Sequence, residues 1–124
     1  MSAPNIVNIT SIYGKTVFDA DISTSDDAIL TNAASSNKLL KVNSLVISNI
    51  DGTSAADITV TIKDASGTLK AKLAHTITVP ADATLVVISK DSAIYLEEDM
   101  AIHLDASAAG DLSAVCSYEE MDDA

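Results

Sequence analysis

The sequence predicts an all-β protein, an antiparallel β-sandwich or barrel with an N-terminal arm, and three observations support this. Short runs of β-branched and aliphatic residues recur along the chain, most regularly over residues 75–118. Turn-forming triplets such as Pro80-Ala81-Asp82 and Ala109-Gly110-Asp111 separate these runs, as expected for strands that reverse every eight to twelve residues. No apolar period typical of a helix continues beyond one turn.

The composition bounds the size and the core of this fold. With 124 residues the chain has room for one domain with a single core. Hydrophobic residues make up 48% of the sequence, but Trp is absent and there is only one Phe. We therefore expect a core of Ile, Val, Leu and Ala side chains. We divide the chain into an N-terminal arm or strand (residues 1–13), a single β-sandwich domain (14–118) and an acidic, frayed tail (119–124).

The first segment, residues 1–13, carries apolar residues that follow no single period. A strand that is apolar on both sides is either central in a sheet or covered by another chain. We predict an arm that pairs with a sheet of this chain or of a neighbouring one. Gly14 is expected to end it, and a second strand is expected over residues 16–22. The apolar residues of the arm are Ile6, Val7, Ile9 and Ile12.

The next part of the chain is a polar loop followed by a strong strand. Residues 21–36 are rich in Ser, Asp, Asn and Ala, with one brief strand around residues 28–30. Residues 39–50 form a strand whose middle is apolar on both faces, so it is either central or beneath a subunit contact. Asp51-Gly52 predicts a tight hairpin in which the glycine takes the left-handed conformation.

The second half of the chain alternates more regularly. Ile58, Val60 and Ile62 alternate with polar residues, which predicts a half-buried strand with its threonines outward. Residues 69–74 predict an edge strand that Lys70 and Lys72 protect from pairing with other chains. Further strands are expected over residues 77–79, 85–89, 93–96, 101–106 and 112–118.

Charge excludes several classes of partner. The chain has 18 acidic and 7 basic residues, a net charge of −11, and no Arg. It therefore repels phosphate backbones and anionic membrane surfaces, so we expect neither nucleic acid nor membrane as a partner. Cys116 is the only cysteine, and alternation with its neighbours predicts a buried hydrophobic residue and not a reactive thiol. No secretory signal is visible, which favours assembly in a reducing cytoplasm.

No constellation of residues predicts catalysis, a cofactor or a metal site, so we expect a protein that is not an enzyme. Asp19, Asp21 and two serines have the spacing of a calcium loop, but Thr24 and Leu30 stand where that loop needs Gly and Glu. The three consecutive acids at 97–99 are more simply a solvated corner than an acid–base pair. The outward-facing His103 has no ligand or base partner at a suitable spacing.

Several strand-and-turn segments form a recognisable pattern: the opening MSAPNIVNITSIYGK and the segments LVISNIDG (45–52), ADITV (56–60), VPADATL (79–85), IYLEED (94–99) and ASAAGDL (106–112). Together they resemble small structural proteins of tailed bacteriophages, and the opening is similar to the start of such proteins from phages of aquatic bacteria. The resemblance covers nearly the whole chain.

The resemblance implies a role in the virion. It implies an antiparallel β-sandwich of the immunoglobulin-like or jelly-roll kind that decorates or cements the capsid, commonly as a homotrimer bound to the major capsid protein, in particles assembled in the host cytoplasm. From the two-sided apolar segments we predict a subunit interface. Its residues are Ile6, Val7, Ile9, Ile12, Leu45, Val46 and Ile47.

The alternative is a tail, neck or fibre-associated β-sandwich module that recognises a host surface glycan. Glycan-binding surfaces generally use exposed aromatic rings, and here Tyr13 and Tyr95 are the candidates. Alternation predicts that Tyr95 faces away from the core. A long fibre would also be expected to show heptads or repeats, and the sequence has none, which favours the decoration role.

Overall fold

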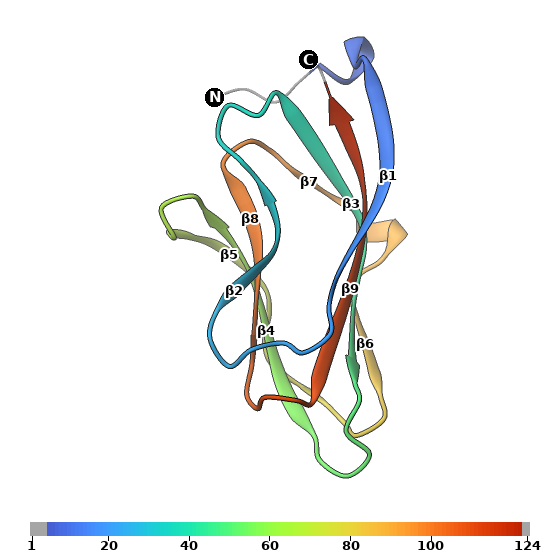
Figure 1. The fold of residues 1–124 in the computed structure, drawn as a ribbon, viewed down its shortest axis with the longest axis vertical. Coiled ribbons are helices and arrows are strands. Elements are labelled where there is room, and N and C mark those ends of the chain that lie inside the picture. The colour runs from blue at the N-terminus through green and yellow to red at the C-terminus, as the bar shows by residue number, and fades with distance from the viewer. Residues whose placement is uncertain (1–4, 123–124) are drawn as a thin grey trace.

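The computed structural model describes residues 5–122, which fold into two antiparallel sheets packed face to face (Figure 1). One sheet has five strands, in the order β1-β9-β3-β6 with the short β7 also paired to β3, and the other has four, in the order β2-β8-β4-β5. The predicted all-β sandwich is therefore confirmed. The strands are β1 (Ser11–Asp19), β2 (Asp27–Asn32), β3 (Lys38–Asn49), β4 (Ala56–Asp64), β5 (Leu69–Val79), β6 (Thr84–Ile88), β7 (Ile94–Leu96), β8 (Met100–Ala106) and β9 (Leu112–Asp122).

The strand pairing is that of a jelly roll. If the three-residue β7 is set aside, the chain behaves as one long hairpin of eight strands: β1 pairs with β9, β2 with β8, β3 with β6, and β4 with β5. Alternate pairs of this hairpin lie in opposite sheets, and the β3–β9 and β4–β8 pairs complete each sheet. This pattern decides between the two predicted kinds of sandwich in favour of the jelly roll.

Aliphatic side chains from both sheets fill the space between them, as predicted. Tyr118 is the only aromatic residue in the buried cluster. Each large aliphatic side chain contributes roughly 1.5–3 kcal/mol when fully buried. Cys116 is also fully buried, as predicted, and its burial raises the pKa of the thiol to about 11. The largest fully buried side chains are Ile22, Leu45, Ile47, Ile58, Leu96, Ile102, Leu104 and Leu112.

The two ends of the described chain differ from the prediction. Gly14 does not end a strand: β1 runs continuously from Ser11 to Asp19, because residues on both sides of the glycine pair with β9. The predicted boundary at residue 13 therefore falls inside β1. Likewise β9 continues to Asp122, so residues 119–122 are strand and not a frayed tail. Residues 1–4 of the predicted arm and 123–124 of the tail lie outside the described residues.

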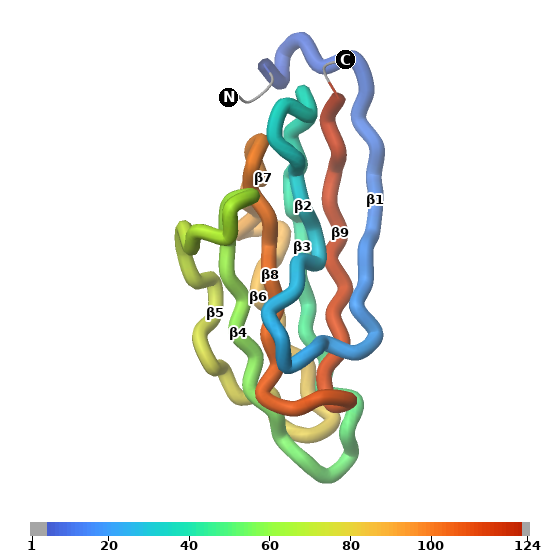
Figure 2. The backbone as a smooth tube through the Cα atoms, turned by 60° about the vertical axis from the view of Figure 1, so that its left-hand side comes forward, coloured from blue at the N-terminus to red at the C-terminus, as the bar shows by residue number. Residues whose placement is uncertain are grey.

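The segment before β1 crosses one end of the sandwich. It contains a 3-10 turn, η1 (Ile6–Asn8), and Figure 2 shows it bending over the end where β3 begins and β9 ends. The backbone N–H of Thr10 donates to the carbonyl oxygen of Asp122 at 3.0 Å, which continues the β1–β9 pairing. The arm is thus tied to the last strand of its own chain.

The predicted hairpin at Asp51-Gly52 is wrong. Gly52 does not have a positive φ, and β3 and β4 lie in different sheets, so the segment is a crossover between sheets. The turn is made instead by the Asp51 carboxylate, which accepts hydrogen bonds from the backbone N–H and the hydroxyl of Thr53 at 2.8 and 2.9 Å. An aspartate side chain that mimics a backbone turn removes the need for a left-handed glycine.

The second half of the chain follows the prediction more closely. Strands β6, β7 and β8 lie within a residue or two of their predicted bounds. The strand predicted at residues 69–74 is an edge strand, as expected, but it continues as β5 through a distortion at Thr76 (φ 46°) to Val79. A second 3-10 turn, η2 (Lys90–Ser92), joins β6 to β7.

Two buried asparagines tie the sheets together at opposite ends. On β3, the Asn49 side-chain amide donates to the carbonyl oxygens of Ser54 and Val79, each at 2.9 Å. On β2, the Asn32 amide donates to the carbonyl oxygens of Lys38 and Leu96, each at 2.9 Å. Each amide therefore satisfies carbonyl groups where the strands of the two sheets separate, and an unsatisfied buried carbonyl would cost about 1–3 kcal/mol.

Candidate interaction surface

The structure separates the residues that the sequence predicts as a subunit interface. Leu45 and Ile47 point into the sandwich and are fully buried in the core of the single chain. Their predicted contact with another subunit is wrong, because a side chain without exposed surface has none to offer a partner. The run is apolar on both faces because β3 is central in its sheet, and only Val46 points outward from it.

The other five predicted interface residues lie in two places. Ile6 and Val7 of η1 and Ile12 of β1 are exposed, and Ile9 is half-buried; all four belong to the segment at the end of the sandwich. Val46 lies in the middle of the five-stranded sheet, half-buried on its outer face. Contact between these residues and another subunit stays a prediction.

The outer face of the five-stranded sheet carries a continuous apolar row. Phe18 on β1 pairs with Val115 on β9, Val115 pairs with Val46 on β3, and Val46 pairs with Val86 on β6. All four point away from the core, because their strand neighbours are buried in it, as Cys116 is, or packed against it, as Val17 and Val87 are. Exposed fractions are 75% for Phe18, 57% for Val86 and 44% for Val115. With neighbouring strands about 4.8 Å apart, this apolar row is roughly 15 Å long.

The residues beside the apolar row are small and uncharged. Hydroxyl pairs bond across the strands, Thr16 with Ser117 at 3.2 Å and Ser48 with Thr84 at 3.4 Å. The full neighbouring rows are Thr16, Ser117 and Ser44 on one side and Ser113, Ser48 and Thr84 on the other. One step beyond the first of these lies a row that contains Gly14, Glu119, Lys41 and Tyr95.

Sequence reasoning missed Phe18, Val86 and Val115 as surface residues. Each lies next to another apolar residue in sequence, so alternation alone does not say which member of the pair points outward. The signal is present only once the strand register is known, because pairing brings the four residues from four different strands into one row. Phe18, the only Phe, was expected to be an ordinary strand residue and is among the most exposed apolar side chains.

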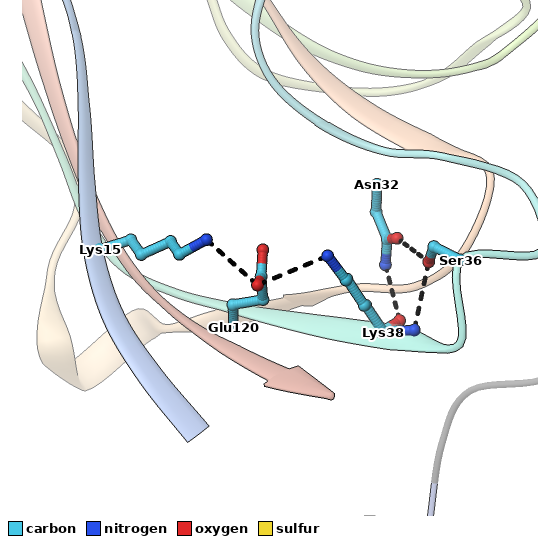
Figure 3. Close-up of polar contacts among 5 residues, drawn as sticks. All are labelled: Lys15, Asn32, Ser36, Lys38 and Glu120. Carbon is cyan, nitrogen blue, oxygen red and sulfur yellow. Dashed lines mark hydrogen bonds and ion pairs between the residues drawn. The ribbon is translucent and has the colours of Figure 1, made fainter. Parts of the chain in front are cut away.

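Near the η1 end, an acidic side chain joins three strands of this sheet. Glu120 Oε2 on β9 lies 3.2 Å from Lys15 Nζ on β1 and 3.5 Å from Lys38 Nζ on β3 (Figure 3). The hydrogen bond with Glu120 raises the pKa of Lys15 above its ordinary value. Both lysine side chains are partly exposed to solvent, which screens the charges, so these ion pairs contribute little to stability. Figure 3 also shows Asn32 contacting Ser36 and Lys38 beside them.

The outer face of the four-stranded sheet is polar and charged. Asp26 forms an ion pair with Lys63 on β4, and its Oδ2 lies 3.3 Å from Nδ1 of His103 on β8. His103 faces away from the core, as predicted. Its neighbour Asp26 is distant in sequence, so spacing along the chain could not identify this contact.

A hollow on this face does not have the size of a ligand site. Its volume is about 120 Å³, below the range of roughly 300–1,000 Å³ typical of small-molecule pockets. It is lined by Asp57, Thr59, Thr76, Asp105, Ala106 and Ser107.

Several acidic side chains of the loops accept hydrogen bonds from backbone N–H groups. Asp21 Oδ1 accepts the backbone N–H of Gly110 at 2.8 Å, and Asp19 Oδ1 accepts that of Asp21 at 3.2 Å. Hydrogen bonds from Thr53 lower the pKa of Asp51, whereas desolvation and the nearby Asp51 carboxylate raise the pKa of Asp111. Within residues 5–122, no group of three or more His, Cys, Asp or Glu is placed to hold a metal ion.

Comparison with known proteins supports the fold and gives no family. No protein-family model matches the sequence, and no curated protein matches it significantly. A chain from Bacillus endospore appendages, described as disulfide-linked pili, is 14% identical with a TM-score of 0.52, over 90% of this chain and 88% of that one. A chain of infectious bursal disease virus, Gx strain, is 10% identical with a TM-score of 0.50, over 90% of this chain and 33% of that one. At these identities the likeness shows a shared sandwich fold alone.

Proposed function

We propose that the chain is a non-enzymatic structural protein of a tailed-bacteriophage virion, where it decorates or cements the capsid shell through contacts between subunits. The observation that carries this proposal is the apolar row across the outer face of the five-stranded sheet. Contiguous exposed apolar residues with a polar border mark interaction sites on soluble proteins. The row is an uncharged contact surface roughly 15 Å long on a chain with a net charge of −11.

The fold and the charge support the same role. Jelly rolls are a common architecture of viral capsid domains. An acidic exterior suits a protein on the outside of a capsid, away from packaged DNA. The partners in this proposal are other copies of the chain and the major capsid protein, and its location is the virion. The resemblance of the sequence to small phage structural proteins is an independent argument for the same role.

The number of copies in the assembly has two candidate values. The resemblance implies a homotrimer. The geometry of the outer sheet face favours a two-fold pair, because a two-fold rotation brings its apolar residues and its opposite charges together. A mass measurement on the purified protein separates these two stoichiometries.

The glycan-binding alternative receives less support from the described surface. Tyr13 and Tyr95 are 52% and 47% exposed. Strand register puts Tyr95 on the outer face of the five-stranded sheet, together with Lys41, whereas Tyr13 alternates with the outward residues of β1. The two rings therefore form no joint platform for a sugar.

The decisive experiment measures whether the protein binds the phage head or the surface of the host. The purified chain is sedimented with DNA-free heads of a phage that carries this gene, and separately with purified lipopolysaccharide of its host. We expect the protein to pellet with the heads and saturate at a fixed copy number, and to remain in solution with the lipopolysaccharide. Binding to lipopolysaccharide without binding to heads would replace decoration with the host-recognition role.

A further inference from the structure

The outer face of the five-stranded sheet is suited to a second copy of the same chain. We propose that two copies pack through this face about a two-fold axis that runs parallel to the strands, between β9 and β3. This inference rests on the proposed function in one respect: a structural role requires copies of the chain to associate, and the inference specifies the contact between them. Its strongest support is that the face is complementary to itself in apolar contacts, in charge and in side-chain size.

The apolar row maps onto itself under this rotation. The strand order β1-β9-β3-β6 is reversed in the second copy, so β1 lies over β6 and β9 lies over β3. Phe18 then meets Val86 of the second copy, and Val115 meets Val46. Face-to-face sheets tolerate an angle of about 30° between their strands, which accommodates the twist of each sheet. An isologous contact of this kind uses one patch twice.

The charges on the face are also paired by the rotation. The charged residues at the outward strand positions set by these registers are Lys41 and Glu119. They are neighbours within one chain, and no ion pair found within residues 5–122 uses either side chain. Because β9 lies over β3, each Glu119 lies over Lys41 of the second copy. Two reciprocal ion pairs result, on a chain whose overall charge would otherwise repel its own copies.

Side-chain size follows the same symmetry. The row with the two charges begins at Gly14 on β1 and ends at Tyr95 on β7, and these are the positions that the rotation superposes. A Cβ added at Gly14 would have nothing within 4 Å, so there is open space above β1 there. Tyr95, which is half exposed, fits above that space. The turn η2, which projects beside the five-stranded sheet in Figure 1, also falls on the β1 side of the second copy.

A charge-swap experiment on the full chain tests this arrangement. We expect the wild-type protein to sediment as a dimer in analytical ultracentrifugation. Lys41→Glu and Glu119→Lys each create two like-charge pairs in their own homodimer, so each should raise the dimer dissociation constant by about 100-fold or more. Mixing the two variants should restore a dimer of about wild-type affinity, because both ion pairs then form between unlike chains. Within each variant chain, residues 41 and 119 still carry like charges, so only an intermolecular contact explains the rescue.

Controls and opposing outcomes complete the design. Lys72→Glu on β5 makes the same charge change on the other sheet and should leave the dimer intact, and circular dichroism checks that each variant is folded. A wild-type monomer, a trimer, or mixed variants that remain monomeric would each overturn the two-fold contact. If a monomeric protein still binds heads, and Phe18→Ser abolishes that binding, the face docks on the shell protein instead. A dimer that fails to bind heads would support the two-fold contact and contradict the decoration role.

Discussion

The two outer faces of the sandwich are built from the same kind of alternating strand but have opposite surfaces. On the five-stranded sheet, a row of apolar side chains crosses four strands with hydroxyl residues on either side. On the four-stranded sheet, the corresponding positions include Lys63 and His103, and Asp26 contacts both. Exposed large apolar residues on the four-stranded sheet are Leu69 and Ile77, both on its edge strand β5.

This difference separates the demands of folding from those of assembly. Both sheets contribute to one core, so the core alone gives no reason for the outer faces to differ. Solubility favours a charged surface, as the four-stranded sheet has. The apolar row works against solubility and adds nothing to the core, which is the pattern expected of a surface that another molecule covers. Perturbing each face separately is therefore the way to test the comparison.

The largest effect is expected from the apolar row. The double variant Phe18→Ser/Val86→Ser removes four apolar side chains, which form two Phe18–Val86 contacts, from each two-fold dimer, and burial of each such side chain contributes roughly 1.5–3 kcal/mol. We expect the dimer dissociation constant to rise by at least about 1,000-fold, measured by ultracentrifugation over a concentration series. The thermal midpoint of the isolated chain should change little, because both side chains are exposed in it.

The matched control is on the other sheet. Leu69→Ser/Ile77→Ser removes two exposed apolar side chains from β5 and should leave the dimer dissociation constant within about threefold of wild type, the range of minor surface changes. Equal weakening by both double variants would mean that association depends on general surface hydrophobicity and not on one face.

Adjacent residues on β3 should separate folding from assembly. Leu45 is fully buried, and Leu45→Ala is expected to lower the free energy of unfolding by about 2–5 kcal/mol. The neighbouring Val46→Ala shortens an outward side chain, so it should lower the free energy of unfolding by less than about 1.5 kcal/mol and weaken the dimer instead. Urea unfolding of the monomer and ultracentrifugation measure the two effects. If Val46→Ala destabilises the monomer as much as Leu45→Ala, the assignment of the two faces fails.

The fold could be predicted from the sequence to a large extent, because it depends on local signals. Alternation of aliphatic and polar residues gave the strands, and the single cysteine was correctly placed in the core. Two predictions from local rules were wrong. In one case a side chain forms a turn that was assigned to a glycine, and in the other a strand continues through a glycine that was expected to end it. The Asp51 carboxylate forms the turn assigned to Gly52, and pairing with β9 carries β1 through Gly14.

The candidate surface was much harder to predict, because it depends on register. Of the four residues in the apolar row, the sequence pointed only to Val46, and it grouped that residue with Leu45 and Ile47, which are buried. An apolar run on a central strand has the same sequence pattern whether one face is covered by the chain or by a partner. Phe18, Val115 and Val86 come from three strands separated by most of the chain, and only the jelly-roll pairing aligns them.

The smallest expected effect is the loss of stability at acidic pH that comes from one carboxyl group on the four-stranded sheet. Asp64, the last residue of β4 before the turn to β5, accepts hydrogen bonds from the Ser66 hydroxyl at 2.7 Å and the Thr68 backbone N–H at 2.9 Å. These bonds lower the pKa of Asp64 below its ordinary value of 3.8. A carboxyl with a lowered pKa in the folded state stabilises the protein above the pKa of the unfolded chain, and this contribution is lost as the pH falls through the folded-state value.

We therefore expect the free energy of unfolding to fall as the pH drops below about 4, with Asp64→Asn showing a smaller fall than wild type. Urea titrations at several pH values between about 7 and 2 measure both curves. Asp91→Asn on η2 makes the same change in charge without removing a side-chain hydrogen bond found within residues 5–122, so it serves as the control. Because the Asp64 turn lies on the sheet without the apolar row, Asp64→Asn should leave the dimer dissociation constant at pH 7 unchanged. A parallel loss of dimer would show that the two sheets are coupled, and the separation of folding from assembly would then fail.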